Sequence, residues 1–548
     1  MGLLSYITIL PEFAFTLPEI NPAWHTVLWN SLIYNPSSPL QLPSAFMIVA
    51  LLFFLGISAT LHNRRRARNL FTTLFSLYLY YKLSGPYLIL LLLIALSDYF
   101  MARGVAGTNL QKRRKLLVAL SVTVNVSILV FFKANGVFAD FVESLSKGGI
   151  SLSKIAVPAG ISFFCFQSIS YVVDSYRGED GAHSVGHATA AAGFQSISYV
   201  VDSYRGKISP LKHFSDYLFL LSFFPKMFLG PLVRNSDFIA QMQREDISIS
   251  KEDVGQATRM IVLGTLKFCI LSKIIGQFFV APAFVGALGD DGFTALMAVY
   301  AFTIQLYCDF SGYTDLATGI SLLVGYRLPL NFNLPYHSAT ITEFWRRWHI
   351  SLSSWLRDYL YIPLGGNRRG TFRTYLNLLL TMILGGLWHG VGLMFLLWGL
   401  WHGVLLCLHK LWMQFVPGAV PLGKDLPLWR RTAGIFFTFN AVAFGWLMFR
   451  SPDWTCFSTI LTDIFGNFSL STIPQTIVAN SPAFSAILIA YLLHVLPSSL
   501  IPRLDRFCTA IRLPGQALLL SLTIWVVLQI DAIFFATASN ALPIYANF

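Results

Sequence analysis

The sequence predicts an all-α, polytopic helical membrane protein, and two observations lead to this prediction. Of the 548 residues, 55% are hydrophobic and 12% are charged, with a mean hydropathy of +0.61, whereas a soluble domain carries about 25% charged residues. Apolar runs close to the ~20 residues that cross a bilayer recur along most of the chain. Because backbone groups in lipid must be satisfied within each segment, the runs are expected to form a helical bundle.

The first apolar runs also predict a topology. Residues 44–61 lead to the basic segment 64–68 (RRRAR), and the runs 69–81 and 86–101 lead to a second basic segment, 112–115 (KRRK). Positively charged loops remain in the cytoplasm. A pair of spans between two such segments is consistent with that rule, and it places the N-terminus outside if residues 1–40 do not themselves span.

Later apolar runs raise the expected total to about 11 to 14 membrane segments. Several are too short for a full span, which predicts short or re-entrant helices or a locally thinned bilayer. These later runs cover residues 116–132, 155–173, 214–233, 260–288, 293–310, 375–388, 391–408, 432–449, 483–495 and 516–535.

Charge and cysteine usage exclude several classes of function. The net charge is +13, but the basic residues stand beside apolar runs, so they indicate cytoplasmic anchoring, and no nucleic-acid partner is expected. The six cysteines are scattered without a CxxC pair, which is typical of core residues rather than of a disulfide or zinc framework; no metal site is expected. Residues 1–28 lack the basic start of a cleavable signal peptide.

One stretch of thirteen residues occurs twice. FQSISYVVDSYRG is read at residues 166–178 and again at 194–206, with an offset of 28. Two copies are too few for a solenoid, and complete identity indicates a recent duplication or a gene-assembly error. The first copy follows a more apolar lead, so we expect it to be embedded in the bundle and residues 178–206 to form an inserted loop.

The most informative segment is residues 343–403, which is rich in histidine, tryptophan, arginine and glycine. Residues 343–361 are expected to form one helix that stops before Pro363. At 100° per residue, one face carries Phe344, Trp348, Leu352, Trp355 and Tyr359. The opposite face carries Arg346, Ser353 and Arg357, flanked by Glu343 and His349.

Two interpretations of this amphipathic helix remain open. It could anchor at the membrane interface with snorkelling arginines, which the pattern alone favours, or it could form a polar wall for an anionic or thioester-bearing donor. The turn at residues 363–370 contains Asn367, Arg368 and Arg369. Its arginines could pair with phosphates, or they could be a positive cytoplasmic flank, which the pattern favours.

His389 is the strongest candidate for chemistry. It lies in LGGLWHG, within an apolar run, where an ionisable side chain is costly and usually functional. A neutral imidazole can take a proton from a hydroxyl, and the neighbouring glycines would allow close approach of a substrate. The alternative is a core histidine that hydrogen-bonds between helices.

The remaining polar residues in apolar runs favour structural roles. His402 is expected to be structural or to support the site residues from behind, and His409 to be an interfacial anchor. Asp309 and Asp315 could bind a proton or cation, but helix capping around Ser311–Gly312 is favoured. No Ser-His-Asp spacing, HExxH, Walker A or GxSxG pattern is present, so neither a covalent serine mechanism nor an ATP-driven machine is indicated.

Several long motifs together resemble the membrane-bound O-acyltransferases, in particular the bacterial alginate O-acetyltransferase branch, with teichoic acid D-alanyl transfer proteins more distant. The resemblance runs over residues 28–450 and more loosely beyond. It is carried by TEFWRRWHISLSSWLRDYLYIPLGGNRRG, GGLWHG, VPAGISFFCFQSISYVVDSYRG, SFFPKMFLGPLVR and YCDFSGYTDLATGISLLVGYRLPLNFNLPY.

The resemblance implies a single transmembrane domain, residues 28–540, around a funnel or tunnel, preceded by an N-terminal extension, residues 1–27. It implies transfer of an acyl group, most simply acetyl, from a cytoplasmic thioester such as acetyl-CoA to hydroxyls on the far side, with no bound cofactor. His389 falls on the family's invariant histidine and His349 on its second conserved one. His389 would be the general base, and His349 would orient the donor or stabilise the oxyanion.

Further expectations follow from the same resemblance. Arg346, Arg357, Asn367 and Trp388 would contact donor or substrate. The acceptor would be an exported polysaccharide or envelope glycan, reached directly or through an extracytoplasmic protein such as an SGNH-type acetyltransferase. The protein would lie in the bacterial inner membrane. The alternatives are a transporter or flippase, although no inverted repeat is visible, a scaffolding subunit, and D-alanyl-type transfer to a cell-wall polymer.

Overall fold

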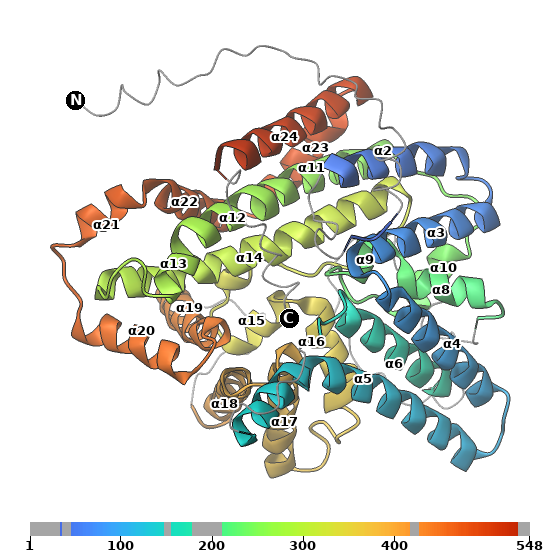
Figure 1. The fold of residues 1–548 in the computed structure, drawn as a ribbon, viewed down its shortest axis with the longest axis horizontal. Helices are drawn as coiled ribbons and strands as arrows, with labels where there is room; N and C mark the ends of the chain where they lie inside the picture. Colours follow the sequence, from blue (N-terminus) through green and yellow to red (C-terminus); the bar gives the residue numbers. More distant parts are fainter. Residues whose placement is uncertain (1–32, 36–44, 147–154, 178–210, 417–426, 535–548) are drawn as a thin grey trace.

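The computed structural model describes residues 33–35, 45–146, 155–177, 211–416 and 427–534. Within these residues every regular element is helical, which confirms the predicted all-α class (Figure 1). The expected N-terminal extension, residues 1–27, and the expected insertion, residues 178–206, lie outside the described residues.

Seven helices of the described chain are long and apolar enough to cross a membrane, so the protein is a multi-pass membrane protein. An eighth would be the pair α21 (Ile473–Ala479) and α22 (Ser481–Val495), which meet at 94°. Other apolar runs form shorter helices, such as α2 (Ala45–Thr60). The seven are α4 (Tyr87–Ala106), α5 (Gln111–Leu145), Lys251–Phe284, α14 (Gly292–Leu323), α18 (Leu393–Phe415), α19 (Leu428–Arg450) and α24 (Leu513–Phe534).

The N-terminal helices form one side of the molecule. α3 (Arg65–Ser84) and α4 are a hairpin of two 20-residue helices that turns at Gly85, whose φ of 56° suits glycine. α5 then packs against α4 and α6 (Ile161–Arg177). α6 contains the described part of the first repeat copy, and all residues from Ile161 to Val172 are buried.

A second group of helices crosses the centre. It begins with α8 (Phe214–Ser222), α9 (Phe224–Met227) and α10 (Asn235–Met242). The span Lys251–Phe284 then alternates α-helical and π-helical turns: α11 (Lys251–Thr265), a π turn at Leu266–Leu271, α12 (Ser272–Ile275), a π turn at Gly276–Val280 and α13 (Ala281–Phe284). It runs beside α14, which is the central helix of the molecule (Figure 1).

The favoured capping role for Asp309 and Asp315 is wrong, because α14 continues through both positions. Gly312 does not break the helix; it allows close crossing, since a Cβ there would lie 2.7 Å from the Phe268 nitrogen. Asp315 instead pairs with Lys267 Nζ at 2.6 Å, and Asp309 accepts a hydrogen bond from Ser272 Oγ at 3.2 Å. Both carboxylates thus join α14 to the neighbouring span.

The histidine-containing segment follows α14. A 3-10 turn at Pro335–His337 leads to α15 (Ile341–Arg347), α16 (Ile350–Leu356) and a π turn at Arg357–Tyr361. α17 (Thr371–His389) and α18 then pack against each other as a hairpin, and α19 packs on α18. The chain continues through α20 (Trp454–Gly466), α21, α22 and α23 (Leu500–Ala510) to α24.

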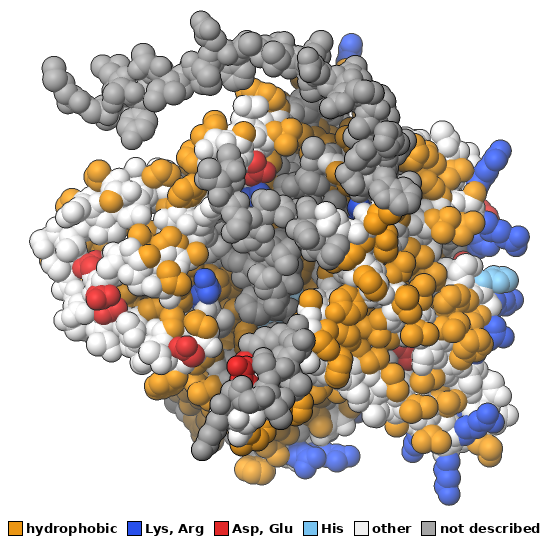
Figure 2. Space-filling model, viewed as in Figure 1, with side chains coloured by type: hydrophobic (Ala, Val, Ile, Leu, Met, Phe, Trp, Pro, Cys, Tyr) orange, Lys and Arg blue, Asp and Glu red, His pale blue; other side chains and the backbone are white. Residues whose placement is uncertain are grey.

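The surface is consistent with a membrane protein whose charge is asymmetric. Figure 2 shows hydrophobic side chains over much of the visible face, and Lys and Arg along its right and lower edges. Large apolar side chains are exposed on the spanning helices, for example Phe100, Phe131 and Trp525. Such exposure is expected where lipid is the solvent.

Candidate active site

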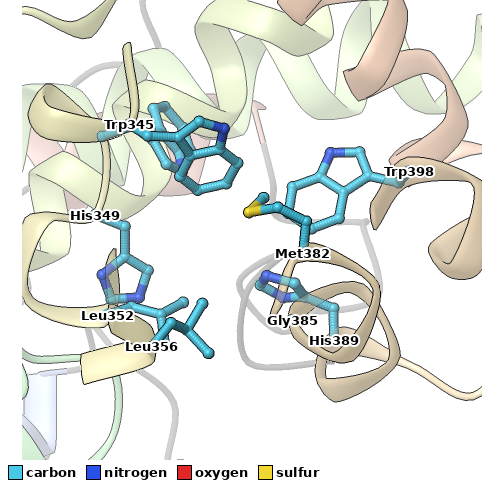
Figure 3. Close-up of a pocket in the computed structure, with 9 residues that line it drawn as sticks. Trp345, His349, Leu352, Leu356, Met382, Gly385, His389 and Trp398 are labelled. Carbon is cyan, nitrogen blue, oxygen red and sulfur yellow. The ribbon is translucent and has the colours of Figure 1, made fainter. Parts of the chain in front are cut away.

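Two histidines from separate segments line one small cavity. His349 lies between α15 and α16, and His389 is the last residue of α17. Figure 3 shows the two imidazoles on opposite sides of the cavity. Both are buried, with 1% and 5% of their surfaces exposed. The other lining residues are Trp345, Trp348, Leu352, Leu356, Met382, Gly385 and Trp398.

The expected single helix over residues 343–361 is wrong, because the chain breaks at His349. Trp348 is extended, and His349 is left-handed, with φ 41° and ψ 57°. A non-glycine residue in this region is uncommon and costs about 1–2 kcal/mol. The two predicted faces survive the break in part: Phe344, Trp348 and Leu352 are buried, whereas Arg346 and Arg357 are exposed. Strain of this kind concentrates at functional sites.

The preceding segment, residues 331–333, compensates for this break. The Asn331 carbonyl accepts from the Ile350 backbone N–H at 2.9 Å, and the Asn333 N–H donates to the Arg347 carbonyl at 2.9 Å. Asn331 Oδ1 accepts from Ser351 N at 3.2 Å and from Ser351 Oγ at 2.8 Å, and it lies 3.1 Å from His349 Nδ1. Hydrogen bonds from a distant part of the sequence therefore replace those of a continuous helix.

Asn331 also sets the tautomer of His349. The backbone N–H of Ser351 can only donate, so the atom that it meets is the Asn331 carbonyl oxygen. His349 Nδ1 must then carry the proton that it shares with this oxygen. His349 Nε2 consequently has a free lone pair, and it is buried without a hydrogen-bond partner among the described residues.

A run of stacked aromatic rings reaches His389. Tyr359 stacks on Trp355 at 5.2 Å, Trp355 on Phe166 at 4.0 Å, and Phe166 on Trp388 at 5.2 Å. The Trp388 ring lies 4.5 Å from the His389 ring. Trp388, expected from the family resemblance to contact donor or substrate, therefore lies between the histidine and α6.

Three arginines gather at the Tyr359 end of this run. Arg357 and Arg234 pair with the Asp358 carboxylate at 2.7 Å and 3.1 Å, and Arg177 donates to the Asp358 carbonyl at 3.1 Å. Neighbouring Tyr359 donates to the Asp174 carboxylate at 2.7 Å. With three guanidinium groups around Asp358, the cluster keeps an excess of positive charge.

The other predicted site residues are not at the cavity. Arg346 and Asn367 are exposed, and neither lines it. Buried His402 packs against Trp345 at 5.2 Å and Trp398 at 5.0 Å, so it lies behind two lining residues. His409 contacts Thr342 Oγ1 at 2.9 Å.

Sequence reasoning missed Lys133. Its ammonium donates to the carbonyl of Trp388, lies 3.4 Å from the carbonyl of His389, and sits over the Trp388 ring at 5.1 Å. Lys133 is in α5, more than 250 residues before His389. The sequence does contain one signal for this residue: a lysine stands between apolar stretches, and burying its charge in a membrane is costly without a partner. In the described part of the chain, no group of three or more His, Cys, Asp or Glu side chains could hold a metal.

The chain is similar to bacterial acyltransferases over most of its length. It is 32% identical to the probable alginate O-acetylase AlgI of Pseudomonas aeruginosa over 451 residues, 78% of this chain and 75% of that protein. It is 30% identical to the peptidoglycan O-acetyltransferase of Helicobacter pylori, over 75% of this chain and 76% of that protein. The teichoic acid D-alanyltransferase of Streptococcus thermophilus is 29% identical over 44% of this chain and 62% of its own length.

The family match covers the helices that build the cavity. Residues 145–447, more than half of the chain, match the membrane-bound O-acyltransferase family, and this range includes both cavity histidines. This match and the length of the similarities favour an acyltransferase over the transporter and scaffold alternatives. The chain therefore belongs to the membrane-bound O-acyltransferase family and is an acyltransferase.

Proposed function

We propose that this protein is an O-acetyltransferase of the bacterial inner membrane. It moves an acetyl group from a cytoplasmic thioester, such as acetyl-CoA, to hydroxyls of an exported polysaccharide or envelope glycan, directly or through an extracytoplasmic partner such as an SGNH-type acetyltransferase. The observation that carries the proposal is the meeting of His349 and His389 in one buried cavity. Buried ionisable groups that converge in a cavity mark the default site for chemistry.

In the proposed reaction His389 is the general base. Its imidazole takes the proton from the acceptor hydroxyl as the oxygen attacks the carbonyl carbon of the thioester. The carbon–sulfur bond then breaks, the ester forms, and the leaving thiolate takes a proton from the imidazolium. The apolar and aromatic lining keeps bulk water from competing with the acceptor.

We assign His349 to orienting a reactant rather than to stabilising the oxyanion. An oxyanion requires a donor, whereas the hydrogen bond with Asn331 protonates Nδ1 and leaves Nε2 as an acceptor. An acceptor on the cavity wall can hold an N–H of the donor or the O–H of the acceptor.

The donor is proposed to approach from the arginine cluster. Arg114 Nη2 donates to the Tyr176 carbonyl at 2.8 Å, so the end of α6 adjoins the basic segment 112–115, which the positive-inside rule assigns to the cytoplasm. Arg177 follows directly and belongs to the cluster. Guanidinium groups there would pair with phosphates of a thioester donor, and the aromatic run continues toward His389. Arg357 thus keeps its donor-side assignment.

The two ends of α17 carry different parts of the proposed site. Asn367 and two arginines precede its first turn, and His389 ends it. Nineteen residues extend about 28 Å along the helix axis, so Asn367 and His389 lie far apart along α17, which is not one of the seven described helices able to cross the membrane by length and composition. We therefore place exposed Asn367, and with it Arg346, at the donor's approach rather than at the chemical step.

Acetyl is favoured over D-alanyl transfer by the extent of similarity. The relatives named as O-acetylases or O-acetyltransferases align with about three quarters of this chain, whereas the D-alanyltransferase aligns with 44% of it. An alanyl group also adds an ammonium, and none of the described residues that line the cavity carries a carboxylate.

The test replaces His389 with alanine and measures O-acetyl content of the cell-envelope glycans at matched protein levels. We expect loss of acetylation, because general-base catalysis contributes about 10²–10⁴-fold. The control is His409→Ala, which changes a histidine outside the cavity and should leave acetylation near the wild-type level. Unchanged acetylation in His389→Ala would show that His389 is not the base.

A further inference from the structure

The C-terminal end of α17 is held by a side chain from another helix. The last carbonyls of a helix have no partner within it, and α17 ends abruptly because Gly390 is extended at φ −172° and ψ 148°. Lys133 of α5 donates to the Trp388 carbonyl and lies close to that of His389. A cation at this end also meets the negative pole of the helix dipole.

The same lysine restrains the side chain beside the histidine. Its ammonium lies over the Trp388 ring at 5.1 Å, while two α6 residues also contact that ring: Phe166 stacks on it at 5.2 Å and Phe163 meets it edge to face at 6.5 Å. Trp388 is therefore confined between α5 and α6, and its ring meets His389 edge to face at 4.5 Å. Lys133 is not one of the described residues that line the cavity, so we treat it as a residue that acts through Trp388 and His389.

We propose that Lys133 is a positioning residue for the acyl transfer, holding the last two residues of α17 so that the His389 imidazole faces the cavity. This inference rests on the proposed role of His389 as the base. A lysine within a spanning helix is expensive, and the contacts of Lys133 described above are made to the end of α17 rather than within α5. Restraint of the end of α17 supplies a reason for this lysine, because displacing a catalytic base by about 1 Å can slow the reaction about 10²-fold.

The experiment compares Lys133→Met and Lys133→Arg in the full-length membrane protein. Methionine has a side chain of similar length but no N–H donors, whereas arginine keeps both the positive charge and N–H donors. We expect Lys133→Met to lower kcat about 10- to 100-fold with little change in the donor KM, and Lys133→Arg to recover most of the loss. Thermal stability and membrane abundance are measured on the same samples.

Lys82→Met is the matched control. Lys82 also donates to a backbone carbonyl, that of Ile33, at 2.5 Å, and it lies over the Phe46 ring at 5.8 Å, so these two partners belong to the N-terminal part of the chain rather than to α17. Its loss should leave kcat near the wild-type value. An equal fall in kcat for the two Met variants would mean that removing any such lysine damages the bundle, and it would overturn the proposal.

Other outcomes are equally decisive. A wild-type kcat in Lys133→Met would overturn the positioning role of Lys133. If His389→Ala were inactive in the same assay, the proposed function would stand without that role. Activity in His389→Ala would overturn the proposed function first. If Lys133→Met does not accumulate, Lys133→Arg is compared with Lys133→Leu, which also lacks the donors, at equal folded protein: higher kcat for arginine supports the role, and equal kcat overturns it.

Discussion

At the scale of single residues, the site depends on a few polar atoms that hold the backbone in a costly shape. His349 is left-handed and almost fully buried, and its Nδ1, the Ser351 N–H and the Ser351 hydroxyl all meet one oxygen of Asn331. Asn331 thus fixes the backbone conformation and the tautomer of the histidine together.

Asn331→Ala should therefore lose both stability and activity. Three buried groups lose their acceptor, which costs about 1–3 kcal/mol, and the His349 ring becomes free to change tautomer and orientation. Thermal melting in detergent and the transfer assay measure the two effects. Asn333→Ala is the control, because exposed Asn333 bonds to Arg347 through its backbone. Equal behaviour of the two variants would contradict the role given to Asn331.

Sequence reasoning found His349 and His389 but neither of their supports. Imidazoles in an apolar chain are conspicuous because they are costly there. Asn331 has no such local signature, and the lysine between apolar stretches at position 133 does not by itself reveal its partner; both become significant through atoms that lie 18 and 255 residues away in the chain.

At the scale of elements, the cavity depends on how closely α17 approaches α18. The crossing is built on glycines: a Cβ at Gly386 would lie 2.3 Å from the Phe395 carbonyl oxygen and 3.1 Å from the Gly399 Cα. Backbone contact of this kind is typical of small residues at helix interfaces in membranes. Gly386 lies one turn before His389, so this contact also sets the histidine's distance from α18.

Gly386→Ala should separate the two helices. The backbone atoms cannot move aside as a flexible side chain would, so we expect a destabilisation of about 1–3 kcal/mol and reduced transfer at matched protein level. Gly56→Ala in α2 is the control, since no atom lies within 4 Å of its added Cβ and alanine favours the helix by about 1 kcal/mol. A melting temperature unchanged by Gly386→Ala would show that the hairpin tolerates a wider crossing.

Helix boundaries show which features hydrophobic periodicity can predict and which it cannot. Hydropathy predicted the helical class and the long spans correctly, but it joined residues 343–361 into one helix. Their local propensity is compatible with a helix, whereas the hydrogen bonds with residues 331–333 that favour the break come from outside the segment. The same limit applies to Asp309 and Asp315, where glycine and serine suggested a helix end and close packing was the actual reason.

At the scale of the whole molecule, one of the two identical copies, residues 166–178 or 194–206, has to take its place in the helical bundle. The first copy is part of buried α6, where Gln167 Nε2 donates to the Val233 carbonyl at 3.1 Å and to Asn235 Oδ1 at 2.5 Å. Gln195 holds the same place in the second copy, which lies outside the described residues.

The identical copies provide a matched pair of variants. We expect Gln167→Ala to reduce stability by about 1–3 kcal/mol, because two buried acceptors lose their donor, and Gln195→Ala to leave melting and membrane abundance unchanged. Both variants are measured in the same detergent. The reverse result would mean that the second copy occupies the position in the bundle.

Taken by itself, the sequence determined the all-α membrane class, the long apolar helices, the basic segments beside them and the segment that contains both histidines. These properties depend on composition and on short periodicities, which act through lipid and local backbone bonding. Only the tertiary structure decided that the two histidines share a cavity, that the helix breaks at His349, and that α5 holds the end of α17. Those facts depend on contacts between segments far apart in the chain, where a few hydrogen bonds and close crossings outweigh local preference.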